Sequence, residues 1–443
     1  MRLPEYAARA LCRLENAGFE AWAVGGCVRD SLRGAEPHDF DLCTAARPEE
    51  MLRVFAGERL IKTGFRHGTL TVLTEGGPLE ITSFRADGSY SDGRHPDGVR
   101  FVSSIREDLA RRDFTVGAMA WHPERGLFDP FGGREDLENR VLRAVGDPDM
   151  RFTEDALRIL RAVRFASELG FSIEENTAAA MERQADRLAL IAPERVREEL
   201  TRLLCGRWVQ RTLLGCTAVI GAALPELRPM FGCTQDNPHH CYDVWGHTVR
   251  AVGQVPPEPC LRWAMLLHDS GKPACKTVDE QGVGHFRGHP KASRALAERL
   301  LPRLRFSNED SERILLLVEQ HDRPLGDSDK LVRRRLAQIG EARFRDLLMI
   351  KKGDAVGQNT QPWDVGTLQG TERLLTEVLR QDSCLSLRRL AVNGRDMQTL
   401  GFTGEKIGEM LRFLLDAVLD DPARNDRETL LRLARTEMEE QHG

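Results

Sequence analysis

Apolar and polar positions alternate in the first third of the chain and follow a helical period in the rest. Residues 4–18 have one apolar face, which predicts an amphipathic helix ending at Gly18, and residues 47–58 predict a second helix. Runs that alternate or are wholly apolar predict strands at 20–24, 38–43, 70–73 and 79–82, the last two joined by a Gly-Gly-Pro turn. One part of the chain therefore folds as an α+β domain.

Helical periodicity dominates beyond residue 143. In the stretch 153–168, apolar residues recur at positions i, i+3, i+4 and i+7, and charged residues occupy the opposite side. We therefore expect one continuous helix there. Further helices are predicted at 177–188 and 193–204.

Composition places the chain among multidomain globular proteins. Its 443 residues are 41% hydrophobic and 30% charged, and this length exceeds what one compact core usually holds. No apolar run approaches the ~20 residues of a membrane span, and the first residues lack the apolar segment of a signal peptide. The ten cysteines form no Cys-x-x-Cys pair, which argues against structural zinc. We expect a cytoplasmic protein with no membrane partner.

A glycine pair carries the first candidate chemistry. Gly25 and Gly26 lie between an apolar run and the start of a predicted helix. Backbone N–H groups in such a turn can approach a phosphate closely, and Arg29 can meet further phosphate oxygens. Taken alone, a glycine pair before a helix also fits an ordinary turn, and the Asp-x-Asp pair that follows also fits solvated surface.

Two aspartates follow within fifteen residues of the glycine pair. Asp39 and Asp41 are two residues apart, so on a strand they share one face, and Glu80 is a possible third carboxylate. Carboxylate oxygens suit Mg²⁺ that also binds substrate phosphates. A phosphate-binding turn beside such a site indicates nucleotidyl transfer with two metal ions.

These motifs resemble the head of the nucleotidyltransferases that add CCA to tRNA, a class shared with bacterial poly(A) polymerases. The stretch 111–118 is similar to the family's Arg-Arg-Asp-Phe-Thr motif, in which the position of Arg112 contacts the nucleotide. Gly117 stands where the family usually has Asn, which puts one polar contact in doubt. The polar stretch 83–98 corresponds to a loop that the family needs to add the terminal A.

The predicted helix 153–168 carries a further resemblance. Its Glu-Asp-x-x-Arg sequence is similar to the family's protein template, which implies that Asp155 and Arg158 pair with the edge of C or A. The resemblance also implies that Arg161 and Arg164 bind the triphosphate. A solvated face of salt bridges is the simpler interpretation of the same charges.

A second group of metal-ligand residues follows. His247, the doublet His268-Asp269 and Asp354 resemble the ligand set of the HD phosphohydrolase superfamily, an all-helical metal-dependent fold. His285, His289 and His321 could join or line this site. The metal that it would bind is left open.

Together these resemblances identify the chain as a bacterial class II tRNA nucleotidyltransferase with an HD domain. The implied fold is a polymerase β-like α+β head followed by an all-α neck, HD domain and tail, at 1–142, 143–232, 233–365 and 366–443. The implied activity is CCA addition to tRNA from CTP and ATP with Mg²⁺ in the head, with no role for DNA. A phosphatase or 2′,3′-cyclic phosphodiesterase activity of the HD site is a possible addition. The alternatives are a poly(A) polymerase, a CC-adding enzyme, and an HD hydrolase whose head senses nucleotides.

Overall fold

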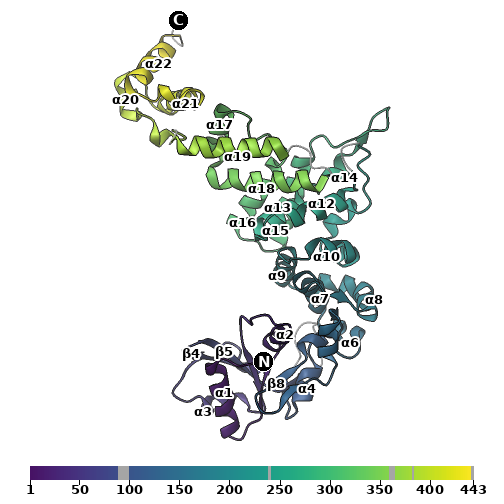
Figure 1. The fold of residues 1–443 in the computed structure, drawn as a ribbon. Coiled ribbons are helices and arrows are strands. Elements are labelled where there is room, and N and C mark those ends of the chain that lie inside the picture. Colours follow the sequence, from purple (N-terminus) through teal and green to yellow (C-terminus); the bar gives the residue numbers. More distant parts are fainter. Residues whose placement is uncertain (88–98, 238–240, 359–364, 382–383, 441–443) are drawn as a thin grey trace. The chain divides into compact units, whose positions relative to one another are not determined.

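The computed structural model describes residues 1–87, 99–237, 241–358, 365–381 and 384–440 (Figure 1). The chain separates into two compact units, 1–225 and 226–443, and each is described by itself. None of the described helices is long and apolar enough to cross a membrane.

The first unit begins with a seven-stranded mixed sheet in the order β3-β4-β5-β2-β1-β8-β9. Strands β2 and β5 pair in parallel, and the other neighbours are antiparallel. The strands are β1 Ala21–Val24, β2 Asp41–Thr44, β3 Arg59–Ile61, β4 Thr69–Thr74, β5 Gly77–Ser83, β8 Ala120–His122 and β9 Gly126–Phe128. The associated helices are α1 Glu5–Asn16, α2 Gly26–Leu32, α3 Pro48–Val54, α4 Ile105–Ala110 and α5 Gly133–Glu138.

The strand predicted at 38–43 begins later than expected. Strand β1 pairs with β2 from Ala21↔Thr44 to Val24↔Asp41, and the chain then turns away at Gly25, where φ is 77°. The ladder between β1 and β2 therefore stops at Asp41, and Asp39 lies before the strand. The expectation that Asp39 and Asp41 share a strand is therefore wrong, although Asp41 is the first residue of β2.

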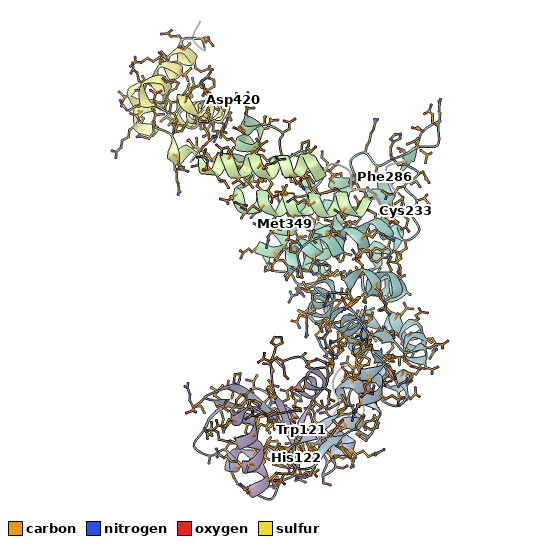
Figure 2. All side chains as sticks on the ribbon, viewed as in Figure 1. Trp121, His122, Cys233, Phe286, Met349 and Asp420 are labelled. Carbon is orange, nitrogen blue, oxygen red and sulfur yellow. The ribbon has the colours of Figure 1, made fainter. Side chains whose placement is uncertain are left out.

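The core of the sheet includes a buried histidine. His122, labelled with Trp121 in Figure 2, is 1% exposed, and its ring lies 5.5 Å from that of Trp22. Strand β6 Arg85–Asp87 lies within the stretch 83–98 expected to act in adding A, and it pairs with β7 Val99–Phe101, which follows that stretch. Residues 88–98 of that stretch lie outside the described residues.

Helices complete the first unit, and one prediction about them is wrong. The expected continuous helix 153–168 is two helices, because Asp155 takes an extended conformation (φ −143°, ψ 104°) between them. The elements are α6 Pro148–Glu154, α7 Leu157–Leu169, α8 Glu175–Gln184, α9 Pro193–Leu204, α10 Val209–Gly215 and α11 Thr217–Ala223, with a short parallel pair β10 Val141–Leu142 and β11 Ser172–Ile173. The Asp155 side chain accepts a hydrogen bond from the Leu157 N–H at 2.9 Å. Asp155 thus stabilises the start of α7 and is not part of a continuous helix.

In its described residues, the second unit is helical apart from one small hairpin. Helix α12 packs on α18, and α13 packs on α16 (Figure 1). The elements are α12 Val244–Gln254, α13 Pro259–Leu267, α14 Lys272–Cys275, β12 Thr277–Val278, β13 Gly284–His285, α15 His289–Arg303, α16 Asn308–Gln320, α17 Asp329–Ile339, α18 Glu341–Gln358, α19 Val365–Arg380, α20 Gly394–Thr399, α21 Glu405–Asp420 and α22 Arg427–Glu440.

Candidate active sites

The glycine turn of the head lies against an arginine. Gly25 has φ 77° and ψ −134°, a conformation that residues with a Cβ rarely adopt, and a Cβ there would stand 3.2 Å from Arg112 Nη1. Gly26 begins α2, and a Cβ there would meet only Arg29 Nη2, at 3.7 Å. Arg112 therefore lies next to Gly25, and Arg29 lies next to Gly26.

Arg112 is held in place by its own segment. It donates to the Gly117 carbonyl at 3.3 Å and pairs with Asp108 at 3.3 Å. Burial would raise the pKa of Asp108, but Arg111 and Arg112 outweigh it and hold that pKa below its usual value. The backbone carbonyl of Gly117 thus helps to position Arg112.

Carboxylates gather at the edge where β2 begins. Asp41 is directly paired with Glu80 across the parallel β2–β5 ladder, and Asp39 is exposed just before it. Burial and the charge of Glu80 raise the pKa of Asp41 to about 6, with a smaller contribution from Asp39 and an opposing one from Arg112. Such mutual repulsion is relieved by a cation, so these residues fit Mg²⁺.

The head carboxylates are more loosely gathered than those of the second unit. Among the described residues, the groups of three or more ligand atoms that lie within 4.8 Å of one another are both in the second unit. A head ion would therefore take part of its coordination from substrate phosphates, as Mg²⁺ commonly does.

Three arginines surround Phe165, a residue that the sequence did not single out. The guanidinium carbons of Arg29, Arg161 and Arg164 lie 5.5, 5.6 and 4.0 Å from its ring centroid. The spacing Arg161–Phe165–Arg164 on α7 supplies two of these contacts, whereas Arg29 comes from α2. The structure thus brings three of the predicted phosphate-binding residues to one aromatic side chain.

Buried and half-buried carboxylates hold Arg161 and Arg164. Arg161 pairs with Asp113 at 2.7 Å, and Arg164, 2% exposed, pairs with Glu199 at 2.6 Å and with Glu168 at 3.1 Å. Burial would raise the pKa of Asp113, but Arg161 outweighs it and lowers that pKa. The solvated face suggested as the simpler interpretation of these charges is therefore wrong for Arg164.

The predicted base-reading pair stands at the break between α6 and α7. Asp155 pairs with Arg195 at 3.3 Å. Arg158 binds Glu154 at 2.5 Å and donates to the carbonyl oxygens of Arg111 and Arg151 at 3.0 and 3.2 Å. In this structure, Asp155 and Arg158 are thus held by different residues.

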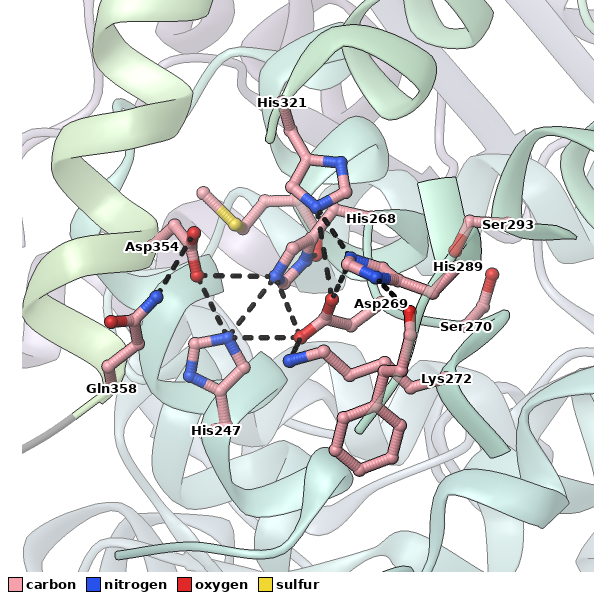
Figure 3. Close-up of polar contacts among 12 residues, drawn as sticks. His247, His268, Asp269, Ser270, Lys272, His289, Ser293, His321, Asp354 and Gln358 are labelled. Atoms are coloured by element: carbon pink, nitrogen blue, oxygen red, sulfur yellow. Dashed lines mark hydrogen bonds and ion pairs between the residues drawn. The ribbon is translucent and has the colours of Figure 1, made fainter. Parts of the chain in front are cut away.

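In the second unit, the four predicted metal ligands converge (Figure 3). His247 Nε2 lies 3.2 Å from His268 Nε2, 3.3 Å from Asp269 Oδ2 and 3.0 Å from Asp354 Oδ1. His268 Nε2 is 3.3 Å from Asp269 Oδ2 and 3.5 Å from Asp354 Oδ1. Ligands placed about 2.1 Å from a tetrahedral ion are separated by about 3.4 Å, so the group fits a divalent metal.

Charges within this cluster are strongly coupled. Burial would lower the pKa of His268, but Asp269 and Asp354 outweigh it and raise that pKa to about 10. Burial would raise the pKa of Asp354, but His247 and His268 hold it well below its usual value. Without a metal, protons on these histidines neutralise the carboxylates, and a metal ion would displace them.

The three further histidines have different places. His289 and His321 approach Asp269 from the other side, at 3.3 and 3.9 Å. His285 lines a cavity together with Asp269, His289 and His321, but it pairs with Asp279 at 2.7 Å and belongs to neither ligand group. Sequence reasoning named all three, but no local motif distinguished the two that face Asp269.

Three models of known protein families match successive parts of the chain. Residues 21–143 match the poly A polymerase head domain, 170–215 match the probable RNA and SrmB-binding site of polymerase A, and 239–347 match the HD domain.

Similar proteins extend the match to the whole chain. A CCA-adding enzyme of Limosilactobacillus fermentum is 33% identical over 428 residues, which are 96% of this chain and 94% of that protein. One from Lactobacillus delbrueckii subsp. bulgaricus is 50% identical over 195 residues, 44% of this chain and 49% of that protein. The crystal structure of the Bacillus stearothermophilus CCA-adding enzyme in complex with CTP is 28% identical, with a TM-score of 0.77 and full coverage of both chains. The Thermotoga maritima enzyme complexed with tRNA, 19% identical with a TM-score of 0.61, covers 99% of this chain and 97% of its own, and shares the fold.

The matched domains define a nucleotidyltransferase whose polymerase-type head is followed by an HD domain. Because the Limosilactobacillus relative matches over almost the full length of both proteins, the chain belongs to the family of CCA-adding enzymes.

Proposed function

We propose that this protein adds C, C and A to the 3′ end of tRNA from CTP and ATP, without a nucleic-acid template. The observation that carries the proposal is the near full-length match to a CCA-adding enzyme, in a chain whose glycine turn, carboxylates and arginines gather in one unit. The similar Bacillus structure is a complex with CTP, which supports CTP as a substrate of this chain.

The head residues have two roles in this reaction, binding of metal ions and binding of phosphate. Asp39 and Asp41 would hold Mg²⁺, which when bound lowers the pKa of the tRNA 3′-hydroxyl and neutralises charge on the triphosphate. The Gly26 N–H would donate to a phosphate oxygen. Arg29, Arg112, Arg161 and Arg164 would donate to the remaining oxygens, and their own carboxylate partners fix their orientation beforehand.

Base selection falls to Asp155 and Arg158. A carboxylate accepts from the exocyclic amine of C or A, and a guanidinium donates to a ring nitrogen or carbonyl. Since Arg158 already binds Glu154 and two backbone carbonyls, a bound base would draw it away from part of that network. Specificity thus depends on a rearrangement at the break between α6 and α7.

The HD cluster supports a second activity, hydrolysis of a phosphomonoester or a 2′,3′-cyclic phosphate. The favouring observation is that His247, His268, Asp269 and Asp354 converge at distances suited to one divalent ion. Imidazole and carboxylate ligands suit a transition metal as well as Mg²⁺.

Several finer expectations stay predictions. They are the bounds of the four domains, the roles of the individual site residues, the cytoplasmic location and the absence of a DNA partner. A poly(A) polymerase and a CC-adding enzyme share the same head chemistry, so product analysis separates them. An HD hydrolase that uses its head as a nucleotide sensor would add nothing at all.

An extension assay tests the proposal. Purified protein with Mg²⁺ and a tRNA ending at its discriminator base is supplied with CTP, ATP or both. The proposal requires growth by C, C and A followed by a stop. A stop after two C would indicate a CC-adding enzyme, and a long A tail on any RNA would indicate a poly(A) polymerase.

A further inference from the structure

A cavity of about 450 Å³ lies in the first unit, outside the residues proposed to carry out nucleotide addition. Its volume is within the range of about 300–1,000 Å³ that is typical of ligand sites. Its walls come from the C-terminal ends of α2, α5 and α7 and from the residues just before α10. We call it the Trp208 cavity, and its lining residues include Arg33, Glu138, Arg140, Phe171, Arg207 and Trp208.

The Trp208 cavity lies close to the predicted phosphate-binding arginines. At the end of α2, Arg33 follows Arg29 by about one helical turn. On α7, Leu169, which lines the cavity, follows Phe165 by the same spacing. Since one turn of an α-helix rises about 5.4 Å, the cavity begins about one turn beyond the arginines that surround Phe165.

Trp208 is an exposed aromatic side chain in a fixed position. Its backbone N–H donates to the Ser167 carbonyl at 2.8 Å. Its ring lies against Gly170, where φ is 74° and where an added Cβ would overlap the indole nitrogen. Trp208 is nevertheless 41% exposed. An aromatic ring presented to solvent in this way is the surface on which bases of single-stranded nucleic acid stack.

Two of the arginines lie beside aromatic rings of the cavity. The guanidinium carbon of Arg207 is 5.8 Å from the ring centroid of Trp208, and that of Arg33 is 5.6 Å from the ring centroid of Phe171. A cation within about 6 Å of an aromatic face is attracted to it. The cavity thus presents positive charge directly beside a stacking surface.

Positive charge dominates the walls of the cavity. Its lining residues include three arginines but a single carboxylate, Glu138, which already pairs with Arg134 at 2.9 Å. Within the described residues, neither Arg140 nor Arg207 forms an ion pair. Two arginines without a carboxylate partner are suited to phosphate groups.

The backbone of Arg140 is strained. Its φ is 56°, in the left-handed region that glycine usually occupies just after a helix. Its carbonyl oxygen accepts from the Ser172 N–H at 2.9 Å, which fixes this conformation. An arginine that occupies a position favouring glycine points to a function of its side chain.

We propose that the Trp208 cavity binds one unpaired nucleotide of an RNA strand. The base stacks on Trp208, and its neighbouring phosphates lie among the three arginines. A free nucleotide is usually buried by 70–90% in its site, whereas Trp208, Arg140 and Arg207 are all exposed, so a strand can enter and leave the cavity. The choice of RNA rests on the proposed addition of nucleotides to tRNA.

Tryptophan fluorescence tests the inference directly. Stacking of a base on an indole ring quenches its fluorescence. The full chain is titrated with a tRNA that ends at its discriminator base, with a short unstructured RNA and with CTP alone. We expect both RNAs to quench a signal that is missing from W208F, and CTP to leave that signal unchanged.

Binding constants for tRNA identify the role of the ring. W208A should bind about 5- to 150-fold more weakly, the range that corresponds to the loss of one stacked base. W208F keeps an aromatic face and should restore most of this affinity. L190A, which removes a 69% exposed apolar side chain of the same unit outside the cavity, should bind as wild type does.

Salt dependence identifies the role of the arginines. R140G should reduce the slope of log affinity against log salt by about 0.7, the effect of one lost phosphate contact with a single strand, whereas W208A should leave the slope unchanged. R140G also removes an unfavourable φ, so it should melt at or above the wild-type temperature. Weaker binding without a loss of stability would be difficult to explain by a structural role.

The possible failures differ from one another. Equal tRNA binding by wild type and W208A, or quenching of Trp208 by CTP alone, overturns the inference. Equal weakening in W208A and W208F, with lowered melting temperatures, would assign the ring to packing alone and also overturns it. If W208A does not fold, the quenching that W208F lacks and the salt slope of R140G decide.

The same proteins separate this inference from the proposed function. Wild type that shows quenching of Trp208 by RNA but adds no nucleotide to the tRNA would refute the proposed function and leave the RNA site intact. Wild type that adds CCA, with W208A unchanged in tRNA binding, would refute the RNA site and leave the proposed function intact.

Discussion

Replacing Gly26 by Ala should preserve the fold of the glycine turn and weaken its proposed binding of phosphate. In the structure, a Cβ at Gly26 would meet Arg29 Nη2 at 3.7 Å, an ordinary van der Waals distance. Gly26 is also the first residue of α2, and Ala is favoured over Gly in helices by up to about 1 kcal/mol. We therefore expect G26A to melt at or slightly above the wild-type temperature.

Nucleotide addition should nevertheless suffer. If a phosphate oxygen approaches the Gly26 N–H, the new methyl group occupies part of its path and the charge-assisted hydrogen bond is lost. Such a bond contributes about 1.5–3 kcal/mol, which corresponds to a rise in KM for CTP of about 10- to 150-fold. Steady-state C addition to a tRNA ending at its discriminator base measures this constant.

A control and a refuting result complete the experiment. Gly215, the last residue of α10, would have no atom within 4 Å of an added Cβ, so G215A makes the same change away from the head turn. It should keep the wild-type KM. A KM for G26A within threefold of wild type would show that the turn does not receive the triphosphate.

Three further substitutions test the electrostatics of the first unit. D41N should lower the rate of C addition by about 10³-fold or more, because a metal ion contributes several kcal/mol to the transition state; an active variant in a single-turnover assay would contradict the metal assignment. E199Q leaves the buried Arg164 without its partner at 2.6 Å, so the free energy of unfolding in urea should fall by about 2–4 kcal/mol, and an unchanged midpoint would argue against this pair as a stabilising contact. The pKa of Asp113 is lowered by Arg161, so this carboxylate stabilises the fold above about pH 4 and its contribution is lost as the pH falls further. The melting temperature of D113N should therefore be lower than wild type at pH 7 and less sensitive to acid, and parallel curves between pH 7 and pH 3 would refute this linkage.

Much of the head could be predicted because its signals are local. The turn at Gly25 and the start of α2 follow from a short pattern of apolar and glycine residues, and a strand that contains Asp41 follows from the apolar run around it. The start of β2 could not be placed, since it depends on where β1 ends. The length of a strand ladder depends on both paired strands, so it cannot be predicted from the sequence of one of them.

The arginine network could be predicted only in part. Helical spacing places Arg161, Phe165 and Arg164 on neighbouring positions of α7, but Arg29 reaches the same ring from α2. The burial of Arg164 depends on Glu199, from a helix more than thirty residues later in the sequence. The extended conformation of Asp155 interrupts an apolar period that continues through it, so periodicity alone predicts one helix.

The HD ligands show the same limit. His268 and Asp269 are adjacent, and that doublet indicates a metal site by itself. His289 and His321 are separated from it and from each other by whole helices. Only the packing of α15 and α16 brings their Nε2 atoms to 3.2 Å, which is why sequence reasoning could name them without assigning them.

The most direct test of the central claim compares C and A incorporation by three proteins on a tRNA that ends at its discriminator base. Wild type should yield a 3′ CCA and stop. The double variant D39A with D41A should add nothing, whereas D354N, altered in the HD cluster of the other unit, should still add CCA. Persistent addition by the D39A and D41A variant would show that the head carboxylates do not carry out nucleotidyl transfer.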